Sequence, residues 1–124
     1  MASAILASPL IAQRGAAPAA AVPAALRDYQ SVTAERLLKP EEQNWLMIRR
    51  TYDGWGFSPL AEIKTDNVSR LQQVWRVSTD ELKVHEAAPI VNGGVMFVST
   101  PNNQVMALNA LTGDVLWRYR RPRP

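Results

Sequence analysis

The fold of this chain is decided by one stretch, ALNALTGDVLW, which occupies residues 107–117. The pair Thr112-Gly113 lies in its middle, and glycine readily adopts the left-handed backbone conformation that a tight turn requires. Residues 104–109 and 115–119, on either side of this turn, have the apolar and aromatic composition of strands. The stretch therefore predicts two antiparallel strands joined by a tight turn.

Two more strands are predicted just before this pair, at residues 88–91 and 95–98. The sequence Asn92-Gly93-Gly94 between them suits a hairpin turn, and Pro101-Asn102-Asn103 leads into residues 104–109. Four short strands joined by tight turns make an antiparallel meander of about 32 residues, the size of one propeller blade. We therefore predict an all-β fold built on one four-stranded propeller blade.

One further strand is predicted at residues 74–79, where Trp75, Val77 and Thr79 alternate with Val74, Arg76 and Ser78. We expect it to lie outside the meander and to close the last blade of a propeller ring. Where that blade is missing, the strand should be unpaired or improvised. A single blade cannot cover its own two apolar faces, and repeat units need at least about three copies for stability. We therefore interpret residues 74–124 as the start of a longer propeller, consisting of one blade and a closing strand.

Residues 27–73 are predicted to form an N-terminal extension of short helices and irregular segments. Residues 33–38 suit a short helix that ends before Pro40, and Pro40-Glu41-Glu42 suits the start of a second one. Thr65-Asp66-Asn67 offers the cap of a brief helix that runs to residue 71. Residues 50–59 place aromatic residues among glycines and predict a loop.

Residues 1–26 differ in composition from the rest, with eleven alanines, three prolines and no acidic residue. An apolar run followed by small residues is typical of a signal peptide, although no positive charge precedes Arg14. The alternative is an Ala/Pro-rich leader without regular structure. We expect a signal peptide remnant and export to the periplasm.

Composition excludes several classes of site. The 124 residues contain no cysteine and one histidine, His85, so disulfides, thiolate metal sites and histidine clusters are excluded. The net charge of +3 arises at the C-terminus, because residues 27–117 hold nine basic and eleven acidic side chains. The tail arginines lack an aromatic platform, so we predict no nucleic-acid partner.

Residues 107–117 resemble the tryptophan-docking motif of quinoprotein dehydrogenases. The matching residues are Ala107, Thr112, Gly113 and Trp117, and the departure is Asn109, where aspartate is usual. The resemblance implies that Trp117 fills the seam between adjacent blades. Asparagine keeps a side-chain oxygen that can accept hydrogen bonds in the turn, so the departure is mild.

The upstream sequence resembles the N-terminal stretch of periplasmic alcohol dehydrogenases that use pyrroloquinoline quinone (PQQ). This resemblance covers residues 29–121, and its main segments are Asn44-Trp45-Leu46, residues 49–60 and His85-Glu86. It implies an eight-bladed β-propeller with PQQ and a calcium or lanthanide ion near the axis. Such an enzyme oxidises an alcohol by hydride transfer to the quinone and passes electrons to a cytochrome c-type acceptor.

For this chain, the resemblance implies one cofactor-binding residue, Glu86, which matches the family glutamate beside the quinone. The family's catalytic aspartate and metal ligands lie in later blades, beyond Pro124, so no catalytic or metal residue is predicted here. We expect an N-terminal fragment that needs the rest of the propeller and is inactive alone. The alternative is a non-catalytic scaffold or binding module built from the same repeat.

Each candidate residue also has a simpler interpretation. Glu86 could be a solvated loop carboxylate, and His85 is expected to be a hydrogen-bonding neighbour of the site and not a ligand. Arg49 and Arg50 could pair with carboxylates of another blade or remain solvated. The four tryptophans could form an aromatic cage, but such wide spacing favours packing between blades: Trp45, Trp55, Trp75 and Trp117.

Overall fold

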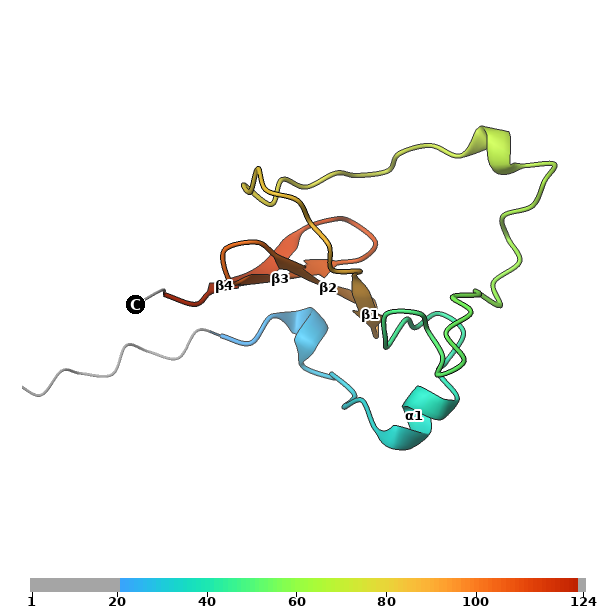
Figure 1. Ribbon diagram of the computed structural model, residues 1–124, viewed down its shortest axis with the longest axis horizontal. Helices are drawn as coiled ribbons and strands as arrows, with labels where there is room; N and C mark the ends of the chain where they lie inside the picture. Colours follow the sequence, from blue (N-terminus) through green and yellow to red (C-terminus); the bar gives the residue numbers. More distant parts are fainter. Residues whose placement is uncertain (1–20, 123–124) are drawn as a thin grey trace, which may run out of the picture.

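The computed structural model describes residues 21–122, which form one four-stranded sheet with an irregular extension around it (Figure 1). The strands are β1 (Ile90–Asn92), β2 (Val95–Thr100), β3 (Gln104–Asn109) and β4 (Val115–Arg120). Each pairs antiparallel with the next, in the order β1-β2-β3-β4. The predicted meander is confirmed, and its strand boundaries lie within two residues of the sequence prediction.

Tight turns of left-handed backbone join the strands. Gly93 and Gly94 have φ angles of +58° and +77°, and they close the hairpin in which Asn92 pairs with Val95. The second hairpin uses Asn102 and Asn103 at +64° and +57°, and asparagine tolerates this region better than most side chains. The turn chemistry in the sequence therefore sets the register of the whole sheet.

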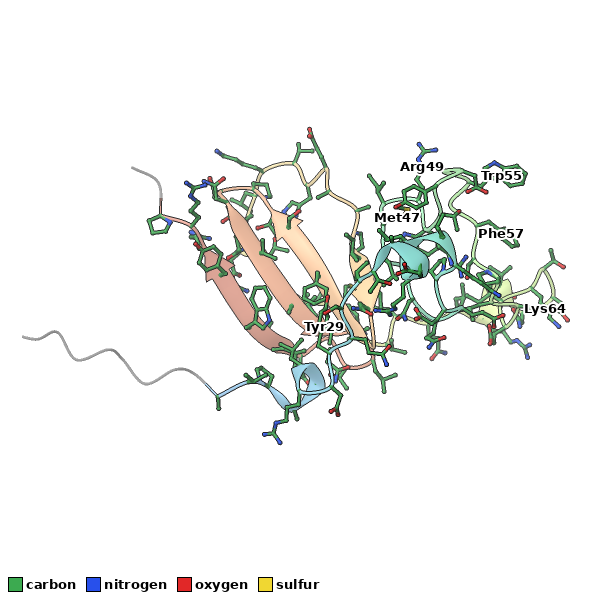
Figure 2. All side chains as sticks on the ribbon, turned by 90° about the horizontal axis from the view of Figure 1, so that it is seen from below. Tyr29, Met47, Arg49, Trp55, Phe57 and Lys64 are labelled. Atoms are coloured by element: carbon green, nitrogen blue, oxygen red, sulfur yellow. The ribbon has the colours of Figure 1, made fainter. Side chains whose placement is uncertain are left out.

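The core of the sheet follows β3, where Met106, Ala107 and Leu108 are buried. Ala107 pairs with Phe97 on one side and Trp117 on the other, so these three residues form a row across the sheet. Because alanine is small, the rings of Phe97 and Trp117 meet over it, with their centroids 6.3 Å apart. Tyr29 from the extension packs edge-on against Phe97 at 6.1 Å, as Figure 2 shows over the sheet.

The extension contains three short helices: η1 (Ala24–Leu26), α1 (Ala34–Leu38) and η2 (Val68–Arg70). The helix predicted at residues 33–38 is confirmed as α1, and the side-chain oxygen of Thr33 caps it by accepting from the backbone N–H of Arg36 at 3.3 Å. The brief helix predicted up to residue 71 is present as the 3₁₀ turn η2. Of the predicted leader, residues 1–20 lie outside the described residues.

The helix predicted to start at Pro40 is wrong, because residues 41–43 form a turn. The backbone N–H of Asn44 donates to the carbonyl of Glu41 at 2.9 Å, which closes the turn. The Glu41 carboxylate accepts from the Arg36 guanidinium at 2.8 Å and from the Asn44 side chain at 2.8 Å. These side-chain hydrogen bonds hold a turn in place of the helix that Pro40, Glu41 and Glu42 predicted.

The same polar cluster attaches the extension to the first hairpin. Arg36 donates to the side-chain oxygen of Asn92 at 2.9 Å, and Asn44 accepts from the backbone N–H of Gly93 at 2.9 Å. Beside it, Trp45 and Val91 exchange both of their backbone hydrogen bonds, at 2.8 and 2.9 Å. The free edge of β1 is therefore occupied by the extension.

Residues 74–79 pair with no other strand within the described residues, as expected for a closing strand whose blade is missing. Their alternation is nevertheless present, because Trp75, Val77 and Thr79 are half-buried while the residues between them are exposed. The segment lies outside the meander, as expected. It returns from an arc that extends far from the sheet in Figure 1. No helix within residues 21–122 is long and apolar enough to cross a bilayer.

Candidate functional site

Glu86 lies in the exposed loop before β1, where it lines an open depression of about 460 Å³. The depression has two walls. The loop wall comprises Lys83, Val84, Glu86 and Ala87, and the strand wall comprises Ser99, Thr100 and Pro101 at the end of β2. The Glu86 carboxylate makes no hydrogen bond or ion pair with any other residue from 21 to 122. It is therefore free to contact a group that enters the depression.

Two neighbouring acids hold the start of the loop wall against β4. Arg118 Nη1 lies 2.7 Å from Asp80 Oδ2, and Arg120 Nη2 lies 2.5 Å from Glu81 Oε1. The hydrogen bond from Arg118, and a further one from Ser78, lower the pKa of Asp80 below its ordinary value. Two of the four tail arginines are thus committed to acids of the same chain, which leaves less positive charge for a nucleic acid.

Glu81 also reaches the strand wall. Its second carboxylate oxygen accepts a hydrogen bond from the side-chain amide of Asn102, in the turn between β2 and β3. Close by, Gln104 donates to the carbonyl of Thr79 at 3.1 Å and to the hydroxyl of Thr100 at 2.9 Å. The two walls are therefore linked by side chains at their common base.

His85, the residue before Glu86, makes its hydrogen bonds within its own loop. Its Nε2 lies 3.3 Å from the Thr79 hydroxyl oxygen and 3.4 Å from the backbone oxygen of Glu81. These contacts close the loop back on its own start. His85 and Glu86 are both exposed, and of these two Glu86 lines the depression.

The donor set of the depression suits part of an anionic, polar ring system. The Lys83 ammonium and the Ser99 hydroxyl can donate hydrogen bonds, and these are the groups that carboxylates and carbonyl oxygens of a quinone require. The Thr100 hydroxyl already donates to the Pro101 carbonyl at 3.2 Å. A metal ion is not accommodated in the same way. Within residues 21–122, no three of His, Cys, Asp and Glu gather into a possible metal site.

A second contact region lies where residues 74–79 meet the turn between β3 and β4. The indole N–H of Trp75 donates to the carbonyl of Ala110 at 3.2 Å, and its ring packs on Gly113. Asn109 shapes this turn, because its side-chain oxygen accepts from the backbone N–H groups of Leu111 and Thr112 at 2.9 and 3.2 Å. The expectation that asparagine would serve the turn as an acceptor is confirmed.

The tryptophans form no cage, since no two of their rings are in contact anywhere in the described range. Trp75 packs on a turn, Trp117 packs on Phe97, and Trp55 is exposed and points away from the sheet in Figure 2. Arg49 donates to the Gly54 carbonyl at 3.3 Å. Arg50 is buried, with one hydrogen bond of 3.4 Å to the Pro40 carbonyl.

Sequence analysis did not find the contacts of Glu81 with Arg120 and Asn102, or that of Trp75 with Gly113. The partners of Glu81 lie 39 and 21 residues away, and no local pattern links them. Trp75 did carry one signal. The sequences Val74-Trp75-Arg76 and Leu116-Trp117-Arg118 follow the same pattern of an apolar residue, tryptophan and arginine. This repetition suggests equivalent places at the outer edges of two blades.

Comparison with known proteins extends this picture to the level of a family. A family model described as the β-propeller domain of glucose, ethanol and alcohol dehydrogenases, named PQQ, matches residues 45–123. The dehydrogenase subunit of the quinone alcohol dehydrogenase of Acetobacter aceti is 38% identical over 106 residues. Subunit 1 of the methanol dehydrogenase (cytochrome c) of Methylorubrum extorquens is 37% identical over 83 residues.

Solved structures give the same result. A quinohemoprotein alcohol dehydrogenase from Pseudomonas putida superimposes with a TM-score of 0.70 at 36% identity, covering 82% of this chain and 14% of that one. A europium-containing methanol dehydrogenase superimposes with a TM-score of 0.65 at 35% identity, covering 73% of this chain and 16% of that one. The match to the Acetobacter aceti subunit covers 84% of this chain and 14% of the relative, so the chain spans about one seventh of it.

Proposed function

Because this chain belongs to the β-propeller family of PQQ-dependent alcohol and methanol dehydrogenases, we propose that it is the N-terminal portion of such an enzyme. The proposed reaction is the oxidation of an alcohol. This chain contributes one side of the quinone site, including the depression that Glu86 lines, and the first blade of the ring. It is inactive alone. The observation that carries the proposal is the likeness to alcohol dehydrogenases over most of the chain, with Glu86 placed in a depression that can receive a ligand.

Glu86 is the residue that we propose to lie against the quinone. PQQ carries three carboxylates, and two like charges 4 Å apart repel by about 1 kcal/mol in water and more in a desolvated site. A glutamate is tolerated there only when positive charge lies nearby. Lys83 lines the same depression and provides such a charge within the loop wall. Ser99 adds a neutral donor on the facing wall.

When bound, the quinone would accept the hydride that leaves the alcohol carbon. The residues of this chain would orient its edge and balance its charge, while the rest of the site comes from other blades. We assign no metal ligand to this chain, and the calcium or lanthanide ion is proposed to bind residues elsewhere. The likeness to the europium-containing methanol dehydrogenase supports this proposal.

Residues 74–79 are proposed to be the outer strand of the blade that closes the ring. Their side chains already alternate between a half-buried and an exposed face, and Trp75 is docked on the turn of the first blade. Their backbone makes no bond to the backbone of another strand within the described range. The backbone is therefore available to pair with a further strand of the propeller.

The cellular setting is proposed from the sequence. The composition of residues 1–26 supports export to the periplasm, where the family resemblance places a cytochrome c-type electron acceptor. Nucleic acid is not proposed as a partner.

The proposed function is tested by preparing the full-length protein without cofactor and adding PQQ and calcium. We expect quinone-dependent oxidation of a primary alcohol with an artificial electron acceptor. If the protein binds PQQ and oxidises no alcohol, or binds no PQQ, the scaffold alternative replaces this proposal. The substitution Glu86→Ala is expected to lower the amount of quinone that stays bound through gel filtration.

Glu62→Ala is the matched control, because Glu62 is also an exposed acid but lines a separate depression among residues 61–67. Equal quinone retention in the two variants would remove Glu86 from the site. The 124-residue chain is tested separately by calorimetric titration with PQQ and calcium. We expect no measurable binding. Saturable micromolar binding would show that the part of the site in this chain is sufficient to bind PQQ.

A further inference from the structure

Glu81 has the best-connected carboxylate near the depression. Only 7% of its side chain is exposed, although it belongs to a loop whose other members are largely solvated. One of its oxygens is held by Arg120 from β4, and the other by Asn102 from the turn after β2. Its backbone oxygen also lies 3.4 Å from Nε2 of His85, the residue before Glu86.

These three contacts join the two walls of the depression. Asn102 follows directly after Ser99, Thr100 and Pro101, which form the strand wall. Glu81 lies two residues before Lys83, the first residue of the loop wall, and the contact with His85 connects it to the residue before Glu86. The separation of the two walls therefore depends on the bonds of Glu81. Charge-assisted hydrogen bonds are shorter and stronger than neutral ones, so they suit this role.

Asp80 provides an internal comparison, because it is the adjacent residue and carries the same charge. It bonds to Arg118 of β4 at 2.7 Å, but 63% of its side chain is exposed, and it has no contact with the strand wall. Loss of the Asp80 pair would remove a solvated link to β4 alone. Loss of the Glu81 pair would also release the two walls from each other.

We propose that Glu81 is a positioning residue for the Glu86 site, fixing the loop wall against the strand wall so that Glu86 and Lys83 face the quinone. This inference rests on the proposed function, in which Glu86 lines the quinone site. Glu81 itself does not touch the cofactor in this arrangement. It acts through the loop at residues 82–87, and Arg120 and Asn102 act with it.

The experiment uses the full-length protein with the variants Glu81→Ala, Glu81→Gln and Asp80→Ala. Two quantities are measured: the PQQ dissociation constant of the cofactor-free protein, and the hydrogen exchange of the amides at residues 82–87. We expect Glu81→Ala to raise the dissociation constant about tenfold, as loss of an orienting partner commonly does, and to accelerate exchange in the loop. Glu81→Gln keeps the shape but loses the charge and one of the two acceptor oxygens, so its dissociation constant should lie between those of the unaltered protein and of Glu81→Ala. Asp80→Ala should change neither quantity more than about twofold, as expected for an exposed pair.

Equal behaviour of the Glu81→Ala and Asp80→Ala variants would overturn the inference. So would faster exchange at residues 82–87 with an unchanged dissociation constant, provided that Glu86→Ala weakens binding. In that case the quinone site stands and Glu81 has only a structural role. If Glu86→Ala leaves the affinity unchanged, it is the proposed site that fails, and with it the quinone-positioning role of Glu81.

Discussion

The indole of Trp75 covers Gly113 so closely that no side chain fits between them. A β-carbon built on Gly113 would lie 2.7 Å from ring atoms Cδ2 and Cε3 of Trp75. Gly113 also has a φ angle of +79°, where side chains are disfavoured. Two independent requirements, contact with the indole and a left-handed turn, therefore select glycine at the Thr-Gly pair.

Gly113→Ala should undock residues 74–79 from the turn. The positive φ costs about 1–2 kcal/mol for an L-residue, and the steric overlap with Trp75 adds to it. In a proton–nitrogen correlation spectrum of the full-length protein, the indole N–H signal that disappears in Trp75→Phe is that of Trp75. We expect this signal to move to the position of a solvated indole in Gly113→Ala. Gly93→Ala is the control, because it has positive φ but no atom within 4 Å of the added carbon. An unmoved Trp75 signal in Gly113→Ala would contradict the contact.

Asn109 should be replaceable by the aspartate that the family motif carries. An aspartate offers the same oxygen to the backbone N–H groups of Leu111 and Thr112, whereas the isosteric Asn109→Leu offers none. Amide hydrogen exchange at these two positions should rise about tenfold in Asn109→Leu, equivalent to roughly 1.4 kcal/mol, and stay unchanged in Asn109→Asp. Faster exchange in both variants would mean that the asparagine amide group has a separate role.

Acid should loosen the extension through Glu41. Hydrogen bonds from Arg36, and then from Asn44, lower the pKa of Glu41 from 4.5 to about 2. A carboxyl group with a lowered folded pKa stabilises the folded form fully above its unfolded value, and this stabilisation is lost as the pH falls from about 4.5 to 2. Fluorescence of the tryptophans, including the neighbouring Trp45, should therefore change in that range. The change should be smaller in Glu41→Gln and normal in Glu62→Gln, and equal titrations in all three proteins would contradict the assignment.

The 124-residue chain alone should bind hydrophobic dyes and melt without a sharp transition. Large apolar side chains lie exposed along the arc and the loops, among them Trp55, Phe57, Ile63, Leu71, Val74 and Leu82. Contiguous apolar surface beyond a few hundred Å² is uncommon in monomeric proteins and indicates a covered interface. A cooperative transition at high temperature in a monomer, with no dye bound, would contradict the need for further blades.

The parts of the fold that the sequence predicts well are those with local causes. Gly93-Gly94 and Asn102-Asn103 are turn signals within a few residues of the strands that they join, so the meander follows from them. The helix predicted to start at Pro40 is wrong because the Glu41 side chain bonds to Arg36 and Asn44. These bonds compete with helix formation, and the local sequence Pro40-Glu41-Glu42 does not predict them. Residues 74–79 keep the predicted alternation of half-buried and exposed side chains but have no strand partner in the described part of the chain. A period of two predicts which side chains share a face, but a strand also needs a partner for its backbone.

The candidate site shows the same division. Glu86 was a candidate because it matches a glutamate of the family pattern, and His85 was considered because it is the preceding residue. Glu81 could not be predicted, because its partners lie in two other hairpin elements and its burial arises only when they assemble. Lys83 was also not predicted as a site residue, because only the folded structure places it in the depression. Nonlocal contacts thus determine most of the site.

The attachment of Asn44 to Gly93 also sets an order of events during synthesis of the chain. The two residues lie 49 positions apart, and the extension leaves the ribosome first. At about 5–20 residues per second, Asn44 would wait roughly 2–10 s before the hairpin that it binds has been made. The hairpins themselves need only neighbouring residues and form within microseconds. The last part of this chain to be translated should therefore be the first to fold, and residues 27–73 would depend on chaperones or on their own solubility in the interval.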